Sequence, residues 1–416
     1  MPTIDREPDS GARDWSAKAQ AFEADMRHLA SLPRESASAG EREAAEWIAM
    51  RLRELGVAAT RIEQEPAHGG YWWPIGVLNA IAAAAGSVAL RARRHRTRLL
   101  AALTGAGAAT ALWDDMSGGS QWFRRFALPQ RSTWNVVGEL GASADEAQRT
   151  IVLIAHHDAA HSGLVFHPAL PRLFPDRFPA LHAKSTQTLP IMVATWLGSA
   201  LSSAGALLGS SRLLKLGLAF AAGTIAAMTD IGTSEVVPGA NDNLSAVVVL
   251  LALAQALHET PPPPGLRVIL LSTGSEESFM EGMRGFGRRH FASLPRQSTE
   301  LLCLECVGGP TLILLEGEGM LKMRDYPQSA RAALAASAQR AGIELGRGLR
   351  TVAATDALIA LRAGYQVSQL ASVDYTKFPA NYHWPSDNPE NLEWSTIGKA
   401  IAVAEEHVRG MLASRA

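Results

Sequence analysis

The chain has 416 residues, of which 47% are hydrophobic, and a formal net charge of -1 at pH 7. A chain of this size and composition can bury a large core and has room for more than one domain. The balance of 39 basic and 40 acidic residues excludes the basic footprint of a nucleic-acid-binding protein. The two cysteines provide no disulfide framework that would argue for secretion.

The first part of the chain is polar and then becomes helical. We expect residues 1–15 to be a disordered head, and the stretch 1–19 lacks the apolar core of a cleavable signal peptide. Apolar residues then recur at three- to four-residue spacing within 22–32 and again within 44–55, which predicts two helices. Residues 58–64 follow as a predicted strand.

Two long segments, 71–131 and 164–232, interrupt the alternation of strands and helices. Each contains two apolar stretches with basic residues between them. The four stretches are 71–90, 99–113, 189–209 and 213–228. Each segment is therefore predicted to form a helical hairpin.

Polar side chains follow directly after a predicted buried strand. After a strand at 134–140, the continuous apolar run 151–155 is short enough for a strand buried on both faces, and it ends in His156, His157 and Asp158. Imidazole is the commonest nitrogen ligand of zinc, and a carboxylate two residues later can hold the ring in the correct tautomer. We therefore treat His156 as a candidate ligand, with His157 as the alternative.

Two further acidic sites lie at the ends of predicted elements. Asp242 lies in a tight loop of small residues before a predicted helix at 246–258. The apolar run 266–271 is followed by Glu276 and Glu277, and adjacent carboxylates must be solvated, paired or bound to a cation. On its own, the glutamate pair is better explained by a solvated loop.

The strand that begins at residue 300 carries Glu305 at its far end, where an unpaired carboxylate would be costly to bury. Cys303 and Cys306 flank it; because consecutive side chains in a strand face opposite sides, we expect buried structural cysteines and no zinc or redox pair. His383 lies in a loop rich in proline and asparagine, and a terminal helix is predicted at 394–412.

The order of these motifs resembles the M28 family of co-catalytic zinc aminopeptidases, whose relatives include glutamate carboxypeptidases and glutaminyl cyclases. The series is His-x-Asp, Gly-Ala-x-Asp-Asn-x-Ser, Glu-Glu, an acidic strand end followed by Val-Gly, and Tyr-His-x-x-x-Asp. The resemblance covers roughly 22–70, 132–163 and 233–412. Five motifs in the right order are far more specific than any one of them.

This resemblance implies two zinc ions per chain that share one carboxylate. The implied terminal ligands are His156, Glu277, Glu305 and His383. Asp242 is the implied bridge, Glu276 the general base, and Asp158 the partner that orients His156. Glutamate is long enough to take a proton from water without binding the metal itself.

One residue departs from the family pattern, because many aminopeptidases of this family carry aspartate where this chain has Glu305. A glutaminyl-cyclase-like aminoacyltransferase with a single zinc therefore remains an alternative. A catalytically inactive scaffold of the same fold is a second alternative, although such domains have usually lost ligands that this chain retains.

The expected fold is α/β, with a mixed, mostly parallel sheet between helices and two inserted helical hairpins. The expected catalytic domain comprises 16–70, 132–163 and 233–416, and the insertions are 71–131 and 164–232. The expected activity is hydrolysis of the amino-terminal residue of a peptide.

The two hairpins are predicted to cross a membrane. A span needs roughly 20 apolar residues, and the first and third stretches reach that length. The basic run 91–98 and Arg212 lie between the stretches, so the positive-inside rule places these tips in the cytoplasm and the catalytic domain outside. Trp72 and Trp113 lie where an aromatic belt is expected. The alternative is a soluble cytoplasmic protein whose hairpins cap the active site.

Overall fold

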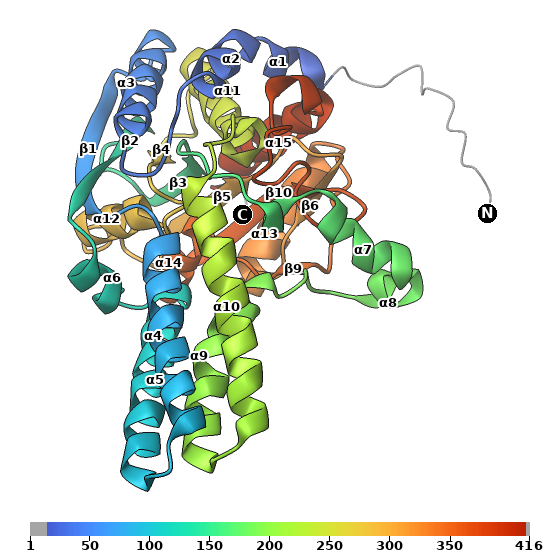
Figure 1. Ribbon diagram of the computed structural model, residues 1–416. Coiled ribbons are helices and arrows are strands. Elements are labelled where there is room, and N and C mark those ends of the chain that lie inside the picture. Colours follow the sequence, from blue (N-terminus) through green and yellow to red (C-terminus); the bar gives the residue numbers. More distant parts are fainter. Residues whose placement is uncertain (1–14, 413–416) are drawn as a thin grey trace.

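The computed structural model describes residues 15–412, so nearly all of the expected disordered head lies outside the described residues. A seven-stranded mixed sheet lies at the centre of the catalytic part, in the order β1-β2-β4-β3-β5-β10-β6 (Figure 1). In that order the strands are Ala59–Ala67, Arg131–Gly141, Leu266–Thr273, Arg149–His156, Thr299–Glu305, Gln366–Val373 and Thr311–Leu314. The expected mixed α/β class is confirmed.

The four strands β4, β3, β5 and β10 are parallel, whereas β1, β2 and β6 extend the sheet in antiparallel pairing. A small second sheet has the order β8-β7-β9. Its strands are Arg324–Asp325, Gly317–Glu318 and Arg350–Thr351. Because the central strands are parallel, their carboxyl ends meet at one edge of the sheet, which is where ligands bind in such folds.

Helices cover both faces of the sheet. Successive side chains of each central strand point to opposite faces. In β3, Ile151 and Leu153 belong to the core on one face, while Val152 and Ile154 belong to the core on the other. The first face is covered by α1 (Ser16–Gln20), α2 (Glu23–Ala30), α3 (Ala39–Glu54), α11 (Ser245–Glu259), α13 (Gln328–Arg340) and α15 (Trp394–Gly410). The second is covered by α12 (Glu281–His290) and α14 (Asp356–Arg362). Both-sided burial explains why these strands are continuous apolar runs.

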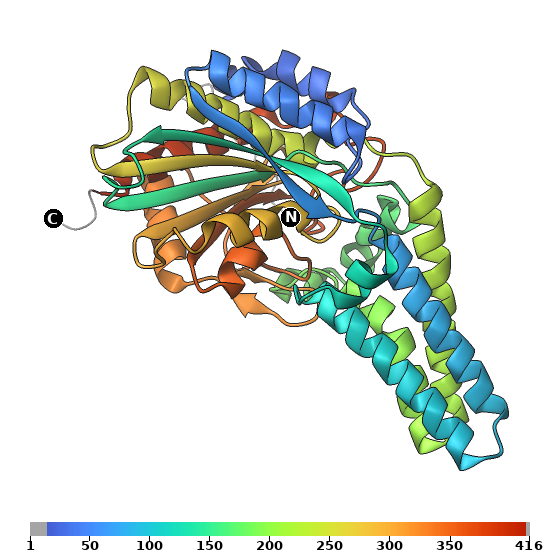
Figure 2. The same ribbon diagram turned by 90° about the vertical axis from the view of Figure 1, so that its left-hand side faces the viewer.

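Four long helices form a bundle that projects away from the sheet (Figures 1 and 2). They are α4 (Trp72–Arg91), α5 (His95–Met116), α9 (Ile191–Leu208) and α10 (Ser211–Thr233). Each hairpin leaves the catalytic part and returns to it, so the basic loops lie at the far tip. At 1.5 Å per residue, helices of 18 to 23 residues are roughly 27–35 Å long, which matches the hydrocarbon core of a bilayer.

Small residues allow the bundle helices to approach closely. A Cβ atom added at Gly198 of α9 would lie 2.8 Å from the backbone nitrogen of Ala221 in α10, and one at Gly105 would lie 3.1 Å from the backbone of Ser203. The buried Asn79 of α4 donates a hydrogen bond to the carbonyl oxygen of Thr195 in α9 (3.1 Å). Close backbone contact and interhelical hydrogen bonds are typical of helix packing in lipid.

Among the described helices, four are long and apolar enough to cross a membrane: α4, α9, α10 and the twenty-residue stretch Ala240–Glu259 that includes α11. The last of these is 89% buried in the catalytic core, so core packing explains its apolar character. The other three belong to the bundle and are only 33–39% buried, because their outer faces expose apolar side chains. The fourth bundle helix, α5, is not apolar enough over a sufficient length to be one of these candidate spans, which agrees with the shorter apolar stretch predicted there.

Short helices at the base of the bundle were not predicted from the sequence. They are α6 (Trp122–Ala127), η1 (Leu164–Phe166), α7 (Ala169–Arg177) and α8 (Pro179–Lys184). Their lengths are too short for a helical period to appear, and Pro175 lies inside α7.

Candidate metal centre

The predicted site residues converge at the carboxyl edge of the parallel strands. His156 is the last residue of β3, Glu305 is the last residue of β5, and Glu276 and Glu277 follow β4 after a short turn. His383 arrives from the loop before α15. Side chains that lie 227 positions apart, counted from His156 to His383, are brought into one cluster because the sheet aligns the strand ends.

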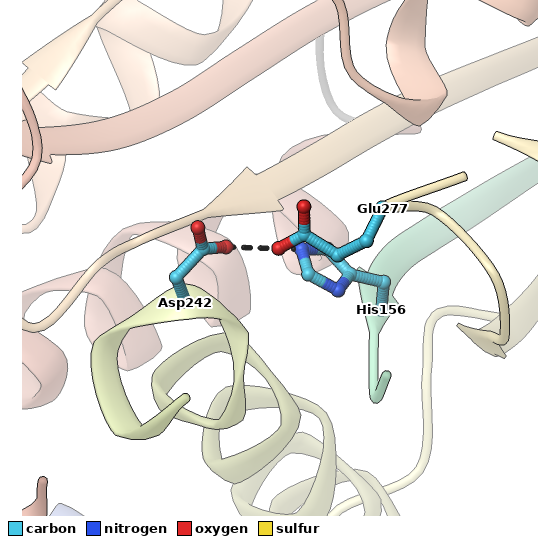
Figure 3. A group of neighbouring side chains, drawn as sticks. All are labelled: His156, Asp242 and Glu277. Carbon is cyan, nitrogen blue, oxygen red and sulfur yellow. Dashed lines mark hydrogen bonds and ion pairs between the residues drawn. The ribbon is translucent and has the colours of Figure 1, made fainter. Parts of the chain in front are cut away.

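Asp242 lies between the two histidines. One carboxylate oxygen, Oδ1, is 3.1 Å from Nε2 of His156, and the other, Oδ2, is 3.2 Å from Nε2 of His383. Figure 3 shows Asp242 pointing from the start of its helix toward His156 and Glu277. A carboxylate that presents one oxygen to each histidine has the arrangement required to bridge two cations.

Each histidine also faces one glutamate. Nε2 of His156 lies 3.3 Å from Oε1 of Glu305, and Nε2 of His383 lies 3.2 Å from Oε1 of Glu277. Two ligands of a tetrahedral zinc ion at about 2.0–2.1 Å lie roughly 3.3 Å from each other. The contacts divide the cluster into two ligand sets that share Asp242, and the spacing within each set fits a zinc ion.

Several of these atoms are buried without a hydrogen-bond partner among residues 15–412. They include Oε1 of Glu277 and both ring nitrogens of His383. Oε1 of Glu277 and Nε2 of His383 face each other, but their geometry is not that of a hydrogen bond. Buried polar atoms left unpaired are costly, and coordination of a cation would satisfy Oε1 of Glu277 and Nε2 of His383. The residues present therefore fit a metal centre.

The charges of the cluster support the same conclusion. Burial raises the pKa of Glu305 to about 7, although the nearby His156 opposes the shift and Asp242 adds to it. Burial, together with Glu305 and Glu277, raises the pKa of Glu276 well above its usual range. Four carboxylates share this buried space with two imidazoles, so a bound cation would keep the ligands ionised at neutral pH.

Glu276 lies beside the ligands without joining either set. Its Oε2 atom is 3.9 Å from Nε2 of His156, and its side chain lines the cavity that opens over the cluster. The neighbouring Glu277 contacts His383 instead. This division of the pair agrees with the base and ligand roles implied by the family resemblance.

Asp158 holds the turn that carries both glutamates. Its Oδ1 accepts a hydrogen bond from the backbone N–H of Glu276 (3.0 Å), and its Oδ2 accepts one from the backbone N–H of Glu277 (3.1 Å). Ser36 donates to Oδ2 as well (2.7 Å). Nδ1 of His156 lies 3.2 Å from the backbone oxygen of Asp158 and 3.4 Å from its carboxylate. Asp158 thus positions both His156 and the glutamate turn.

Replacing Asp158 with asparagine should therefore lower kcat and metal affinity together, by about 10- to 100-fold each, because an amide cannot accept hydrogen bonds at both of its heavy atoms. Steady-state kinetics and a competitive zinc titration would measure both effects. Alanine at Ser36 should cause a smaller change in the same direction. Unchanged kinetics in Asp158→Asn would show that the carboxylate does not position the turn.

Three residues outside the candidate ligand set support the site: Asp387, Glu41 and Ser36. The carboxylate of Asp387 accepts hydrogen bonds from the backbone N–H groups of Asn241 (2.6 Å) and Asp242 (3.1 Å), so it orients the bridging aspartate. The buried Glu41 accepts hydrogen bonds from the backbone N–H and the hydroxyl of Ser275, which precedes the glutamate pair. Asp387 is the aspartate of the Tyr-His-x-x-x-Asp motif, but its carboxylate holds the loop of Asp242. Ser36 lies in the turn before α3, and Glu41 lies in the first turn of that helix, where its backbone N–H donates to the side chain of Ser38 (3.2 Å). This capping pattern marks a helix start and does not indicate a contact with the site.

The remaining candidates lie away from the cluster or pack around it. His157 faces Ser272, and burial lowers its pKa to about 3, so it is neutral in the core. Tyr382 stacks on His383, with ring centroids 3.8 Å apart. Cys303 and Cys306 are both free and buried, as expected.

Left-handed backbone conformations occur at or beside several of the candidate site residues. Ser275, Cys306 and His383 have φ angles of 50°, 50° and 51°. Non-glycine residues in this region are strained, and such residues concentrate at functional sites. The loops at the strand ends are therefore held in shape by the surrounding hydrogen bonds.

A cavity of about 160 Å³ opens over the cluster. Asp242, Glu276, Glu277, Glu305 and His383 contribute to its wall. Most of the remaining wall is apolar and comes from both the catalytic part and the bundle. These apolar residues include Tyr71, Phe166, Ile191, Met192, Phe279, Ile313, Leu315, Met320 and Leu349.

Residues 226–408 match peptidase family M28, which confirms the resemblance stated from the motifs. This segment carries Asp242, Glu276, Glu277, Glu305 and His383. His156 and Asp158 precede the matched segment and join the same cluster through β3. No curated protein matches the chain.

Solved structures show the same fold at low sequence identity. A glutaminyl cyclase from Bacteroides thetaiotaomicron is 13% identical, with a TM-score of 0.54 over 96% of this chain and 98% of that one. A Zn-dependent exopeptidase from Parabacteroides distasonis is 13% identical, with a TM-score of 0.53 over 95% and 99%. A zinc aminopeptidase from Bacillus subtilis is 12% identical, with a TM-score of 0.52 over 95% and 95%. The catalytic part therefore has a zinc-exopeptidase-like fold.

Proposed function

We propose that the protein is a zinc-dependent aminopeptidase that removes amino-terminal residues from peptides. The observation that carries this proposal is the arrangement around Asp242, whose two oxygens face two separate His–Glu pairs. Two ligand sets that share one carboxylate are suited to a pair of zinc ions. When bound, zinc would supply Lewis-acid activation of water and of the scissile carbonyl.

The chain's own residues account for the proton transfers. Glu276 lines the cavity, and its Oε2 atom lies 3.9 Å from Nε2 of His156. As a general base it would accept a proton from the attacking water and then deliver that proton to the leaving amine. Asp158 keeps Glu276 at its place by accepting hydrogen bonds from the turn. The left-handed backbone at Ser275 and Cys306 helps to direct the neighbouring glutamates toward the cavity.

A glutaminyl cyclase is the second candidate function, because solved cyclases share the fold. Incubation with a peptide that begins with glutamine distinguishes the two activities. An aminopeptidase releases free glutamine and leaves a peptide one residue shorter. A cyclase releases ammonia and leaves a peptide of unchanged length with a blocked amino terminus. Mass spectrometry of the products separates these outcomes, and cyclisation without free glutamine would reject the proposal.

We further propose that the bundle anchors the protein in a membrane, with the catalytic domain on the side opposite the cytoplasm. Support comes from the exposed apolar faces of α4, α9 and α10 and from the basic loops at the tip of the bundle. The bundle projects away from the sheet (Figure 2), and only the starts of its helices, such as Ile191 and Met192 of α9, line the cavity. Retention in the membrane fraction after carbonate washing, together with extraction by detergent, is the expected result.

A further inference from the structure

The base of the bundle is surrounded by exposed apolar and basic residues that belong to none of its four helices. On one side lies α6, which exposes Trp122 and Phe126, the latter 86% exposed. On the other lie α7 and α8, whose exposed apolar side chains include Leu173, 63% exposed, and Phe178. Figure 1 places these short helices at the edge of the catalytic part from which the bundle emerges. We call α6, α7 and α8 together the collar.

The exposed charges of the collar are mostly basic. Its exposed basic residues are Arg125, Arg172, Arg177 and Lys184. Its exposed acidic residue is Asp176. Aromatic side chains also extend from the neighbouring helix ends, because Trp73 at the start of α4 and Trp113 near the end of α5 are exposed. Aromatic and basic side chains gathered at one level are suited to the headgroup layer of a bilayer.

The collar also borders the entrance to the active site. A second cavity of about 480 Å³ is lined by Leu170 and Arg172 of α7, by Ile191 at the start of α9, and by Tyr382 next to the candidate ligand His383. Lys377 connects the end of α8 to the cavity over the cluster. It donates hydrogen bonds to the carbonyl oxygens of His182 and Ser185 (both 2.6 Å). The side chain of Lys377 also lines the cavity over the cluster.

We infer that the collar sits in the headgroup layer of an anionic bilayer and holds the mouth of the active site at the membrane surface. This inference rests on the proposed anchoring of the bundle. Three features select a lipid surface as the partner: the exposed aromatic side chains, the excess of basic residues, and the continuity of the collar with the apolar faces of the bundle helices. Peptides adsorbed at the same surface would reach the cavity without leaving it, so we expect them to be the substrates of the enzyme.

Fluorescent labels on single introduced cysteines test the position of the collar in the full-length protein. The native cysteines are buried, so labelling is directed to the introduced residue. Leu173→Cys and Phe126→Cys report on the collar, and Leu103→Cys reports on the exposed face of α5 in the bundle. Glu43→Cys on the exposed surface of α3, at the far end of the catalytic part, is the matched aqueous control (Figure 1). The protein is reconstituted in nanodiscs that contain phosphatidylglycerol.

Nitroxide attached to the lipid headgroup should quench the two collar labels severalfold more than the Glu43→Cys label, and aqueous iodide should quench them severalfold less. Nitroxide on the acyl chain should quench the Leu103→Cys label. Collar labels that respond like the control, beside a Leu103→Cys label in lipid, would overturn the collar inference and leave the anchoring proposal standing. A Leu103→Cys label that iodide can quench would overturn both the collar inference and the anchoring proposal. The peptidase activity is tested independently by the product assay.

Charge reversal distinguishes a specific headgroup contact from simple proximity to the bilayer. With Arg172→Glu and Arg177→Glu combined, the Leu173→Cys label should lose most of its headgroup quenching. The Phe126→Cys label on the other side of the bundle should keep its quenching and serves as the control. Unchanged quenching at Leu173→Cys would contradict a role for the basic residues of α7.

Discussion

Glutamine at position 276 is expected to lower kcat by about 10²- to 10⁴-fold while the bound zinc is retained. Glu276 lines the cavity beside the ligands, and its nearest ligand nitrogen, Nε2 of His156, is 3.9 Å away. Glutamine has nearly the same shape but cannot accept and return a proton, so the change removes the base and spares the fold. Hydrolysis of aminoacyl-nitroanilides, measured together with the zinc content of the same sample, checks both parts of this expectation.

The adjacent residue provides the matched comparison. Glu277 has the same chemical type and neighbours Glu276 in the chain, but its carboxylate faces His383 at 3.2 Å. Glu277→Gln should therefore reduce zinc content, and added zinc should restore part of its activity. Excess zinc should restore nothing in Glu276→Gln. If Glu276→Gln loses zinc as readily as Glu277→Gln, the division of the pair into base and ligand is incorrect.

Asparagine at position 242 is expected to have the largest effect on metal binding. Both carboxylate oxygens of Asp242 face ligand histidines, and asparagine replaces one of these oxygens with an NH₂ group that cannot bind a cation. Zinc per chain should fall from two to one or fewer, with a loss of affinity beyond the roughly 10- to 100-fold typical of outer-shell changes. Metal analysis after dialysis against a weak chelator measures this loss, and chelation of the native protein should abolish its activity.

Glu300→Gln is a suitable control for Asp242→Asn. Glu300 is also a buried carboxylate, and it lies at the opposite end of β5 from Glu305, where His407 contacts it at 2.8 Å. Its loss should affect stability and leave zinc content unchanged. A full complement of two zinc ions in Asp242→Asn would contradict the bridging role of Asp242.

Much of the catalytic part was predictable because its evidence is local. The central strands are short apolar runs, and this pattern follows directly from burial on both faces of a parallel sheet. The polar motifs lie immediately after these runs, so their place at the carboxyl edge follows from the strand prediction itself. The helical hairpins were predicted for a similar reason, since their apolar stretches are long and continuous. The short helices α6, α7 and α8 were not predicted, because six to nine residues are too few to display a helical period.

The residues that hold the site loops in place could not be predicted from local sequence patterns. Glu41 contacts Ser275, next to the glutamate pair, across 234 positions of the chain, and Ser36 contacts Asp158 across 122 positions. No local pattern marks either contact. Asp387 lies in the motif of His383, yet its carboxylate serves the loop of Asp242. Such contacts depend on how loops from different strands meet above the sheet. These contacts are determined by tertiary packing, so no regular residue spacing in the sequence indicates them.

The sequence by itself determined which side chains are available for the chemistry. Each motif places its residues at the end of a strand, whichever strand is its neighbour in the sheet. It also determined that two segments are too apolar to be ordinary loops. Only the tertiary structure decided that His156 faces Glu305, that His383 faces Glu277, and that the two oxygens of Asp242 join the sets. It alone decided that the bundle projects away from the sheet and that the collar lies at its base. Pairings of this kind arise from the alignment of strands and helices distant in the chain, which local residue order does not encode.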